Sequence, residues 1–139
     1  NIIEEKIEKR FNRHLKIKKY VRKKIRSFGL KLFIENDEYA SSALTTFILP
    51  KKIKLSDFVK KMDKDYNIVI SGDLGYVDRH LVRIAHMGNS ANISYVNKTL
   101  NVIHRIEGYQ SYDYFESIKS KFPKLDMNIE PGSFYIQKL

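Results

Sequence analysis

The first 28 residues carry the pattern that most constrains the fold of this chain. Apolar side chains, with one histidine among them, recur every three or four positions over residues 3–28, as in an amphipathic helix. Such a helix must pack its apolar half against another layer, and Gly29 supplies the stop at its C-terminal end. The sequence therefore predicts a long N-terminal helix over a core. Its apolar half comprises Ile3, Ile7, Phe11, His14, Leu15, Ile17, Val21, Ile25 and Phe28.

The positive charge of the chain is concentrated in this same helix. The formal net charge is +10, and residues 1–35 contain twelve of the 26 Lys and Arg residues but only four of the 16 acidic residues. This pattern fits either a solvated helix face or a nucleic-acid-binding module that uses the helix. Binding to single strands would need exposed aromatic side chains between the charges, and Tyr20 is the single candidate. The pattern favours the solvated face, and no nucleic-acid partner is expected from it.

The composition sets further limits. With 139 residues and 42% hydrophobic residues, the chain fits one globular domain. It has no cysteine, which excludes disulfides and thiolate metal sites, and its histidines are too scattered to predict a metal site. No apolar run approaches the roughly 20 residues of a membrane span, and no secretory segment opens the chain. A cytoplasmic location without a membrane partner is expected, and the start at Asn1 rather than Met suggests a piece of a longer protein.

Short segments rich in β-branched and aromatic residues alternate with helical patterns along the rest of the chain. Strands are predicted over Leu30–Ile34, Ala43–Leu49, Asn67–Ser71, Leu81–His86 and Ser133–Lys138. Further helices are predicted over Asp57–Lys64 with Ser56 as its cap, from a cap at Asn89 or Ser90 to Glu107, and over Ser111–Phe122. Short loops between neighbouring strands favour antiparallel pairing. The predicted fold class is α+β, a two-layer sandwich with a mostly antiparallel sheet of four strands, or five with the last one, and helices on one face.

The run from Gly72 to Gly88 contains a charge where an apolar strand is predicted. Arg83 lies between Val82 and Ile84. Burying a guanidinium without an anion costs several kcal/mol. Arg83 should therefore either pair with an acidic side chain, such as Asp73 or Asp78, or bind an anionic ligand.

Three segments of the chain resemble a known enzyme family. His14–Phe33 contains a helix that ends in a Gly-Leu step, Ser41–Ile53 contains a strand that ends in proline, and Tyr66–Gly88 contains a glycine-rich loop followed by R-I-A-H-M-G. In this order and spacing they resemble the C-terminal small domain of class V aminotransferases, the fold-type I pyridoxal-phosphate enzymes of the alanine–glyoxylate and serine–pyruvate group. The resemblance covers residues 10–106.

The resemblance implies a function for the parent protein and a role for Arg83. In such enzymes the arginine of this strand binds the α-carboxylate of a small amino acid or 2-oxo acid. Gly72, Asp73 and Gly75 would then belong to a loop at the cleft. Pyridoxal 5′-phosphate, its anchoring lysine and its phosphate-binding loop belong to a large domain that is absent from this sequence. The chain alone is therefore expected to hold no catalytic residue and to be inactive, and the full-length enzyme is expected to be a homodimer.

The resemblance also implies a division of the chain into two parts, and two residues differ from the family's pattern. Residues 1–107 would form the small domain, and residues 108–139 a helix–strand extension that matches nothing in the family. Asp73 stands where the family usually has glycine, and Ala85 replaces the glycine of the R-I-G step. His86 and Gly88 are secondary candidates, and a hydrogen-bonded structural role is favoured for His86. The alternatives are a nucleic-acid-binding module and a non-catalytic regulatory domain of the same fold.

Overall fold

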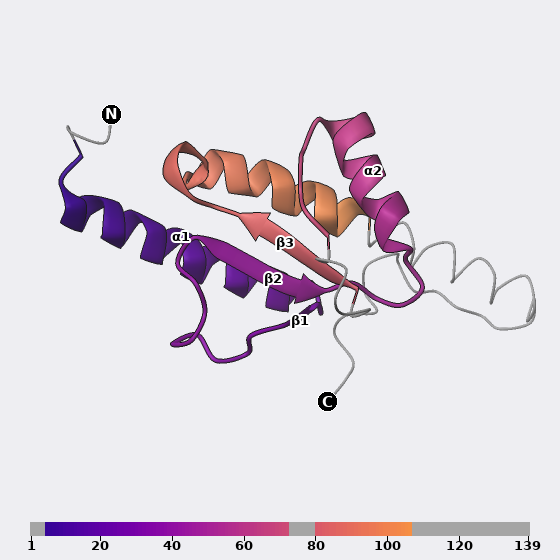
Figure 1. Ribbon diagram of the computed structural model, residues 1–139, viewed down its shortest axis with the longest axis horizontal. Coiled ribbons are helices and arrows are strands. Elements are labelled where there is room, and N and C mark those ends of the chain that lie inside the picture. The colour runs from indigo at the N-terminus through magenta and orange to yellow at the C-terminus, as the bar shows by residue number, and fades with distance from the viewer. Residues whose placement is uncertain (1–4, 73–79, 107–139) are drawn as a thin grey trace, which may run out of the picture.

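The computed structural model describes residues 5–72 and 80–106, and its first element is the long helix α1, Ile7–Ser27 (Figure 1). The predicted helix is confirmed, although it begins at Ile7 rather than at residue 3. Gly29 ends it as predicted, with φ at +75°. Its N–H donates to the Arg26 carbonyl at 3.0 Å, and the Leu30 N–H donates to the Ile25 carbonyl at 3.2 Å. These two bonds form a Schellman motif, which satisfies carbonyls at the end of the helix.

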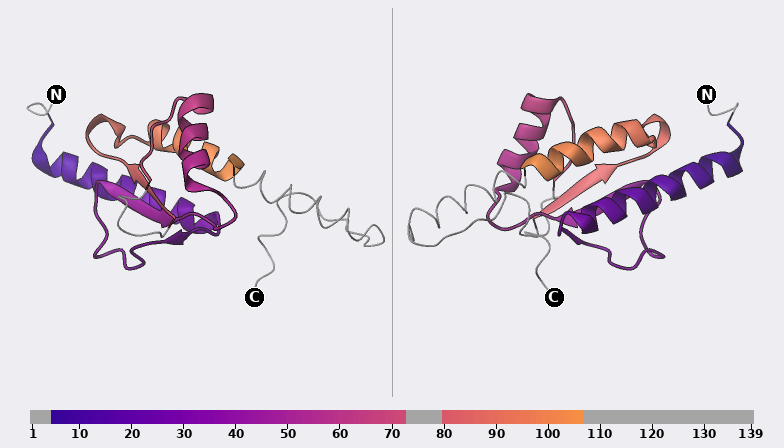
Figure 2. Two further views of the ribbon diagram at one scale, coloured as in Figure 1. Left: turned by 45° about the vertical axis from the view of Figure 1, so that its right-hand side comes forward. Right: turned by 180° about the vertical axis from the view of Figure 1, so that it is seen from behind.

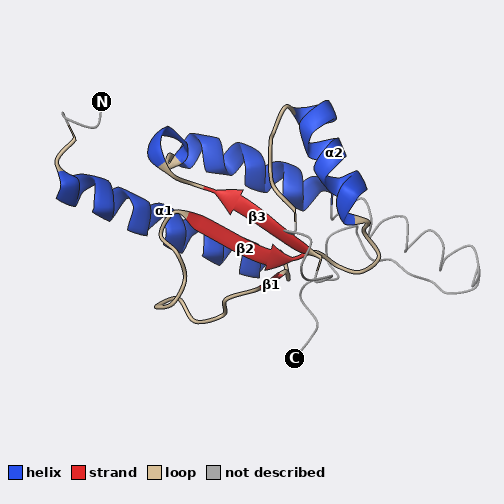
Figure 3. Cartoon of the chain, viewed as in Figure 1, coloured by secondary structure: helices blue, strands red, loops and turns tan. Residues whose placement is uncertain are grey.

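The described residues form an antiparallel sheet of three strands in the order β1-β2-β3 (Figure 3). The strands are β1 (Lys31–Leu32), β2 (Leu44–Ile48) and β3 (Leu81–Ala85), each shorter than predicted. The α+β class and the antiparallel pairing are confirmed. The predicted strand Ser133–Lys138 and the predicted helix Ser111–Phe122 lie outside the described residues.

The predicted strand Asn67–Ser71 is wrong except at its last residue. Asn67 adopts the left-handed conformation, with φ at +53°, and ends the preceding helix instead of beginning a strand. Only Ser71 pairs with the sheet, through an isolated antiparallel bridge to Arg83. The Arg83 N–H donates to the Ser71 carbonyl at 2.9 Å, and the Ser71 N–H donates back at 3.4 Å. Ser71 therefore extends the β3 edge at one point.

The two faces of the sheet differ in burial. Side chains alternate along β2 and β3, and the members of one face are buried. Seen from behind, α1 lies in front of β1 and β2, and a helix over residues 93–106 runs beside β3 (Figure 2). The prediction of helices on one face is confirmed for these two. The buried face consists of Thr45, Phe47, Val82 and Ile84.

Two predicted helix caps are wrong. Helix α2 covers Leu55–Tyr66, so Ser56 lies inside it, and the residue at its N-terminus makes no side-chain cap. The third helix begins at residue 93, after a short 3₁₀ turn η1, Gly88–Ser90. Its cap is Asn92, whose Oδ1 accepts the Ser94 N–H at 2.8 Å. In each case a residue type that favours the cap position, Ser56 or Ser90, lies two positions from the residue that precedes the helix, which is Lys54 or Asn92.

The apolar face of α1 is buried only along its C-terminal half. Ile17, Val21 and Ile25 belong to the core, whereas Ile7 is 84% exposed and Phe11 is 60% exposed. The sheet and the third helix supply the rest of this core. No helix of the described residues is both long and apolar enough to cross a membrane.

Candidate functional site

Arg83 lies at the centre of β3 and faces away from the helical layer. Its neighbours Val82 and Ile84 are buried on the face covered by the helices, and Arg83 itself is half-buried on the opposite face, which it shares with the buried Leu81. Thr46 of β2 lies directly opposite it. Hydrogen-bonded pairs alternate along an antiparallel ladder, and the pairs just beyond the strand ends, Ala43 with His86 and Leu49 with His80, are bonded. Thr46 and Arg83 therefore form a non-hydrogen-bonded pair, in which the side chains lie close together. The positive charge of Arg83 therefore lies on the face of the sheet opposite the helical layer.

The guanidinium of Arg83 is held by a backbone carbonyl. Its Nε donates to the Gly72 carbonyl at 3.1 Å, across the bridge that joins Ser71 to β3. No acidic side chain of residues 5–72 and 80–106 forms an ion pair with it. The two acids predicted as its partners, Asp73 and Asp78, lie outside the described residues, as does Gly75.

Gly72 lies close to helix α2. A Cβ added at this position would lie 3.3 Å from Cδ2 of Leu55, closer than most such contacts. The absence of a side chain therefore allows the backbone to approach α2 while its carbonyl anchors Arg83. The resemblance predicts a place for Gly72 in a loop at the cleft, but it does not predict this contact. Gly88 differs, because its φ is +56° and the space around it is open.

His86 lies on the other face of the sheet from Arg83. It is fully buried, and its Nε2 lies 2.8 Å from the Thr45 hydroxyl. Burial lowers the pKa of His86, because the charged imidazolium would lose its hydration. The structure therefore brings Gly72 together with Arg83 and places His86 apart from both.

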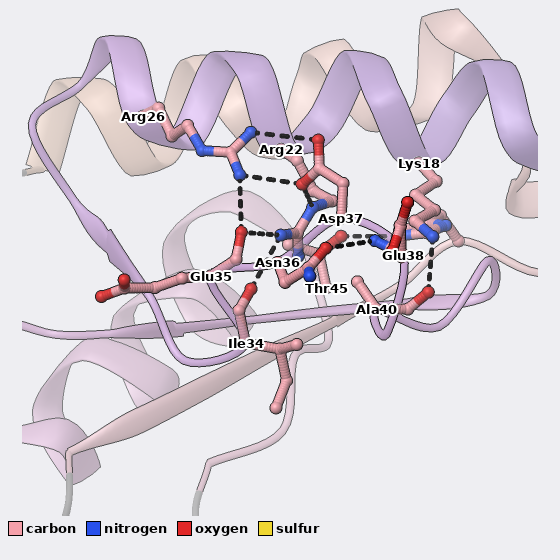
Figure 4. A network of polar contacts seen from close by, with 11 residues as sticks. Lys18, Arg22, Arg26, Ile34, Glu35, Asn36, Asp37, Glu38, Ala40 and Thr45 are labelled. Atoms are coloured by element: carbon pink, nitrogen blue, oxygen red, sulfur yellow. Dashed lines mark hydrogen bonds and ion pairs between the residues drawn. The ribbon is translucent and has the colours of Figure 1, made fainter.

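The structure also contains a polar network that sequence reasoning missed, between α1 and the loop over residues 34–40 (Figure 4). The side chain of Arg22 is only 2% exposed, and its Nε donates to the Asp37 carboxylate at 2.5 Å. Arg22 also donates to the carbonyls of Ile34 at 2.7 Å and Glu35 at 3.1 Å. Arg26 reaches the same carboxylate at 2.8 Å. A buried guanidinium is thus paired and hydrogen-bonded, as its burial requires.

Lys18 continues this network by one turn of the helix. It is buried, and its Nζ donates to the Ala40 carbonyl at 2.5 Å. The spacing i, i+4, i+8 of Lys18, Arg22 and Arg26 was the available signal, because it places three cations in one row. The prediction that the basic side chains of α1 are solvated is therefore wrong for Lys18 and Arg22. These two charges are also unavailable to a nucleic acid.

Arg26 and Arg22 together lower the pKa of the Asp37 carboxyl group. The hydrogen bond from Arg26, followed by that from Arg22, lowers the pKa of Asp37 from 3.8 to about 2. Asp37 therefore stays ionised at any pH near neutrality. The loop that leads into β2 is fixed to α1 by charge.

Comparisons with known proteins give a consistent relationship. No protein-family model matches the chain. The chain is 31% identical over 88 residues to the serine–glyoxylate aminotransferase of Arabidopsis thaliana, a match that covers 63% of this chain and 22% of that protein. It is 31% identical over 90 residues to the alanine–glyoxylate aminotransferase of Rattus norvegicus, covering 65% and 22%.

A solved structure gives the same relationship for the fold. The crystal structure of ureidoglycine–glyoxylate aminotransferase from Bacillus subtilis matches with a TM-score of 0.70 and 25% identity, over 76% of this chain and 27% of that one. The chain thus spans about a quarter of the length of each of these proteins. The resemblance inferred from the sequence is confirmed: this chain is similar, in sequence and in fold, to one part of the class V aminotransferases, as expected of a C-terminal domain fragment.

Proposed function

We propose that residues 1–107 are the small C-terminal domain of a pyridoxal-phosphate-dependent aminotransferase, in which Arg83 binds the α-carboxylate of the substrate. The observation that carries this proposal is the placement of Arg83. It lies on the face of the sheet opposite α1 and the third helix, anchored through Nε to the Gly72 carbonyl, with no ion pair to an acid of the described residues. The similarity to aminotransferases supplies the reaction class, the transfer of an amino group between a small amino acid and a 2-oxo acid.

The chemistry of a guanidinium suits this role. Its planar fork of N–H donors matches both oxygens of a carboxylate, which fixes the orientation of the bound acid as well as its position. Nε is bonded to Gly72, so the terminal amino groups of Arg83, for which no hydrogen bond to a described residue is found, would be the donors to the ligand. The loop with Gly72, Asp73 and Gly75 would border the bound acid. Orientation matters for amino transfer, since the Cα–H bond must be aligned for the proton to leave.

The described residues do not fit pyridoxal phosphate itself. A cofactor of this kind needs a lysine that can reach it, and the described lysines other than Lys18 are exposed on the surface. Lys18 lies on the buried side of α1, and its Nζ donates to the Ala40 carbonyl. The cofactor would therefore be bound by another domain of a longer, cytoplasmic and homodimeric enzyme, to which this chain would contribute Arg83. Residues 108–139 would be an extension of the small domain.

The test uses the longer protein that carries this chain. Its coding sequence upstream of Asn1 should encode a cofactor-binding domain with an anchoring lysine. In that protein Arg83→Gln should lower kcat/KM for carboxylate substrates by about 2–4 kcal/mol in transition-state terms, mostly through a higher KM. Arg83→Lys keeps the charge but not the fork, and it should recover only part of this loss.

Arg105 offers a matched control, because it is an exposed arginine on the third helix. Arg105→Gln should leave the kinetics unchanged. Normal kinetics of Arg83→Gln would refute the carboxylate role of Arg83. An upstream sequence without a cofactor-binding domain would instead refute the assignment to an aminotransferase.

A further inference from the structure

Two adjacent threonines of β2 differ in what their hydroxyl groups contact. Thr45 lies on the face covered by the helices, and its hydroxyl oxygen lies 2.8 Å from Nε2 of the buried His86. Thr46 lies on the opposite face and is half-buried, and its hydroxyl forms no hydrogen bond with a described residue. A threonine hydroxyl can donate one hydrogen bond and accept two, so the Thr46 side chain has capacity for a ligand.

Sheet pairing places this hydroxyl beside Arg83. Thr46 is the cross-strand partner of Arg83, and Ser71 pairs with Arg83 from the other side through the isolated bridge. Side chains of directly opposite residues point to the same face of a sheet, so these three lie in one row with the arginine in the middle. In such a pair the Cβ atoms typically lie about 4.5–5.5 Å apart, so one small ligand can contact both side chains.

The anchor of Arg83 makes the two ends of this row unequal. Its Nε donates to the Gly72 carbonyl at 3.1 Å, and Gly72 follows Ser71 on the side of β3 away from β2. The guanidinium is therefore held from the Ser71 side, whereas its side toward β2 borders the small side chain of Thr46. A carboxylate bound by the terminal amino groups of Arg83 would lie next to the Thr46 hydroxyl.

A carboxylate can accept more hydrogen bonds than one arginine donates to it. Its two oxygens offer about four lone-pair directions, and a bidentate guanidinium occupies two of them. A neighbouring hydroxyl can donate to a third, and a hydrogen bond to an ionised acceptor is stronger than one between neutral groups. The row of Thr46, Arg83 and Ser71 contains no acidic side chain that would take this place. Its donors therefore suit an anionic ligand.

We propose that Thr46 is a second substrate-binding residue, whose hydroxyl donates a hydrogen bond to the same carboxylate that Arg83 binds. This inference rests on the proposed function of Arg83 and adds to it a residue on the neighbouring strand. An amino acid and a 2-oxo acid share the carboxylate, so Thr46 contributes equally to the binding of both substrates. Ser71 lies on the anchored side of Arg83 and makes no such contact.

The experiment measures steady-state kinetics of the longer protein that carries this chain. The amino donor is L-alanine or L-serine, whichever the wild type uses faster, and the acceptor is glyoxylate. Thr46→Val removes the hydroxyl but keeps the size and the β-branched shape, which a strand tolerates. It should raise KM for donor and acceptor by the same factor, about tenfold, with kcat changed less than about twofold, as expected for the loss of one hydrogen bond to a charged group. Thr46→Ser restores the hydroxyl and should recover most of the loss.

Two comparisons separate a ligand contact from a general disturbance of the sheet. Ser71→Ala removes the other hydroxyl of the row, and it should raise KM less than about threefold because Ser71 does not reach the ligand. The double variant Arg83→Gln/Thr46→Val tests whether both residues bind one group. With Arg83 replaced, Thr46→Val should raise KM by much less than tenfold, because residues that share a partner do not act additively.

The outcomes distinguish this inference from the proposed function. An unchanged KM in Thr46→Val, together with a raised KM in Arg83→Gln, would overturn the role of Thr46 and leave that of Arg83 intact. Normal kinetics of Arg83→Gln would refute the proposed function itself. A loss that Thr46→Ser does not recover, or an equal loss in Ser71→Ala, would also overturn the role of Thr46. So would a KM raised for only one of the two substrates.

Discussion

Asp37→Asn is the most direct probe of how α1 holds the loop over residues 34–40. The carboxylate of Asp37 pairs with Arg22, whose side chain is 2% exposed, and with Arg26, which is half exposed. An asparagine keeps the size of the side chain but removes its charge. The buried guanidinium of Arg22 then retains only the carbonyls of Ile34 and Glu35 as acceptors.

The expected cost follows from the exposure of the two partners. Removing one member of a fully buried ion pair costs about 3–5 kcal/mol, and a hydrogen bond to a charged group contributes about 1.5–3 kcal/mol. The Asp37 side chain is 52% exposed, so water replaces part of what is lost. We therefore expect Asp37→Asn to lower the free energy of unfolding by about 1.5–3 kcal/mol at neutral pH. Urea denaturation followed by circular dichroism measures this value.

A control in the same loop separates burial from charge. Glu35 pairs with Lys31 at 3.2 Å, and both side chains are about 70% exposed. Glu35→Gln should cost less than about 0.5 kcal/mol, because exposed pairs contribute little. Equal costs for Asp37→Asn and Glu35→Gln would refute the reasoning that burial of Arg22 makes its partner essential.

The pH dependence of Asp37 adds a second readout. Its pKa in the folded protein is about 2, below its ordinary value of 3.8, because of the hydrogen bonds from Arg26 and Arg22. A depressed carboxyl pKa stabilises the fold above about pH 4, and this contribution is lost as the pH falls toward 2. Asp37→Asn should lack this part of the acid dependence. A wild-type-like loss of stability in the variant between about pH 4 and pH 2 would show that other carboxylates govern it.

Three further substitutions probe other contacts. Gly72→Ala places a Cβ 3.3 Å from Cδ2 of the half-buried Leu55, whose side chain must shift by a few tenths of an ångström, and it should lower the free energy of unfolding in urea by less than about 1.5 kcal/mol; the same cost in a Leu55→Ala background would argue against this contact as the cause. Thr45→Val removes the hydroxyl at the fully buried His86 and should cost about 1–3 kcal/mol by the same assay, whereas an unchanged midpoint would mean that His86 finds another partner. Nε and Nη2 of Arg13 each donate to one oxygen of Glu5 at 2.8 Å, which lowers the pKa of Glu5 to about 2. Arg13→Leu should return this pKa toward its ordinary range in an NMR titration, and a value still near 2 would contradict the assignment to Arg13.

The features that the sequence predicted well depend on neighbouring residues. The helical period of residues 7–27 and the glycine at position 29 are local signals, and both correspond to the structure. Arg83 stood out because a charge within an apolar strand is locally anomalous. Its anchor, Gly72, lies eleven residues earlier, and the bridge at Ser71 that brings the two together follows from sheet pairing. Residue patterns alone do not specify such a pairing.

The features that the sequence missed depend on segments that return from a distance. Lys18 and Arg22 are buried because the loop over residues 34–40 passes beneath α1 and offers its carbonyls and one carboxylate. Without that loop, an amphipathic pattern assigns every charged residue to solvent. Phe11 shows the opposite error: the helical pattern predicts that it is buried, but it is 60% exposed because no described element packs against it.

The way in which α1 holds this loop has a consequence for sequence divergence. Lys18, Arg22 and Arg26 bind mostly main-chain oxygens, those of Ile34, Glu35 and Ala40, which every amino acid provides. Among the side chains of this loop, Asp37 alone is bound by the arginines. Besides Asp37, the buried Ala40 and the Asn36 side chain, whose Oδ1 accepts the Glu38 N–H at 2.8 Å, constrain this loop, whereas Tyr39 is 80% exposed. A substitution scan of residues 34–40 should therefore find Asp37 the least tolerant position and Tyr39 among the most tolerant, so that the exposed side chains of this loop can diverge while its main-chain path is kept.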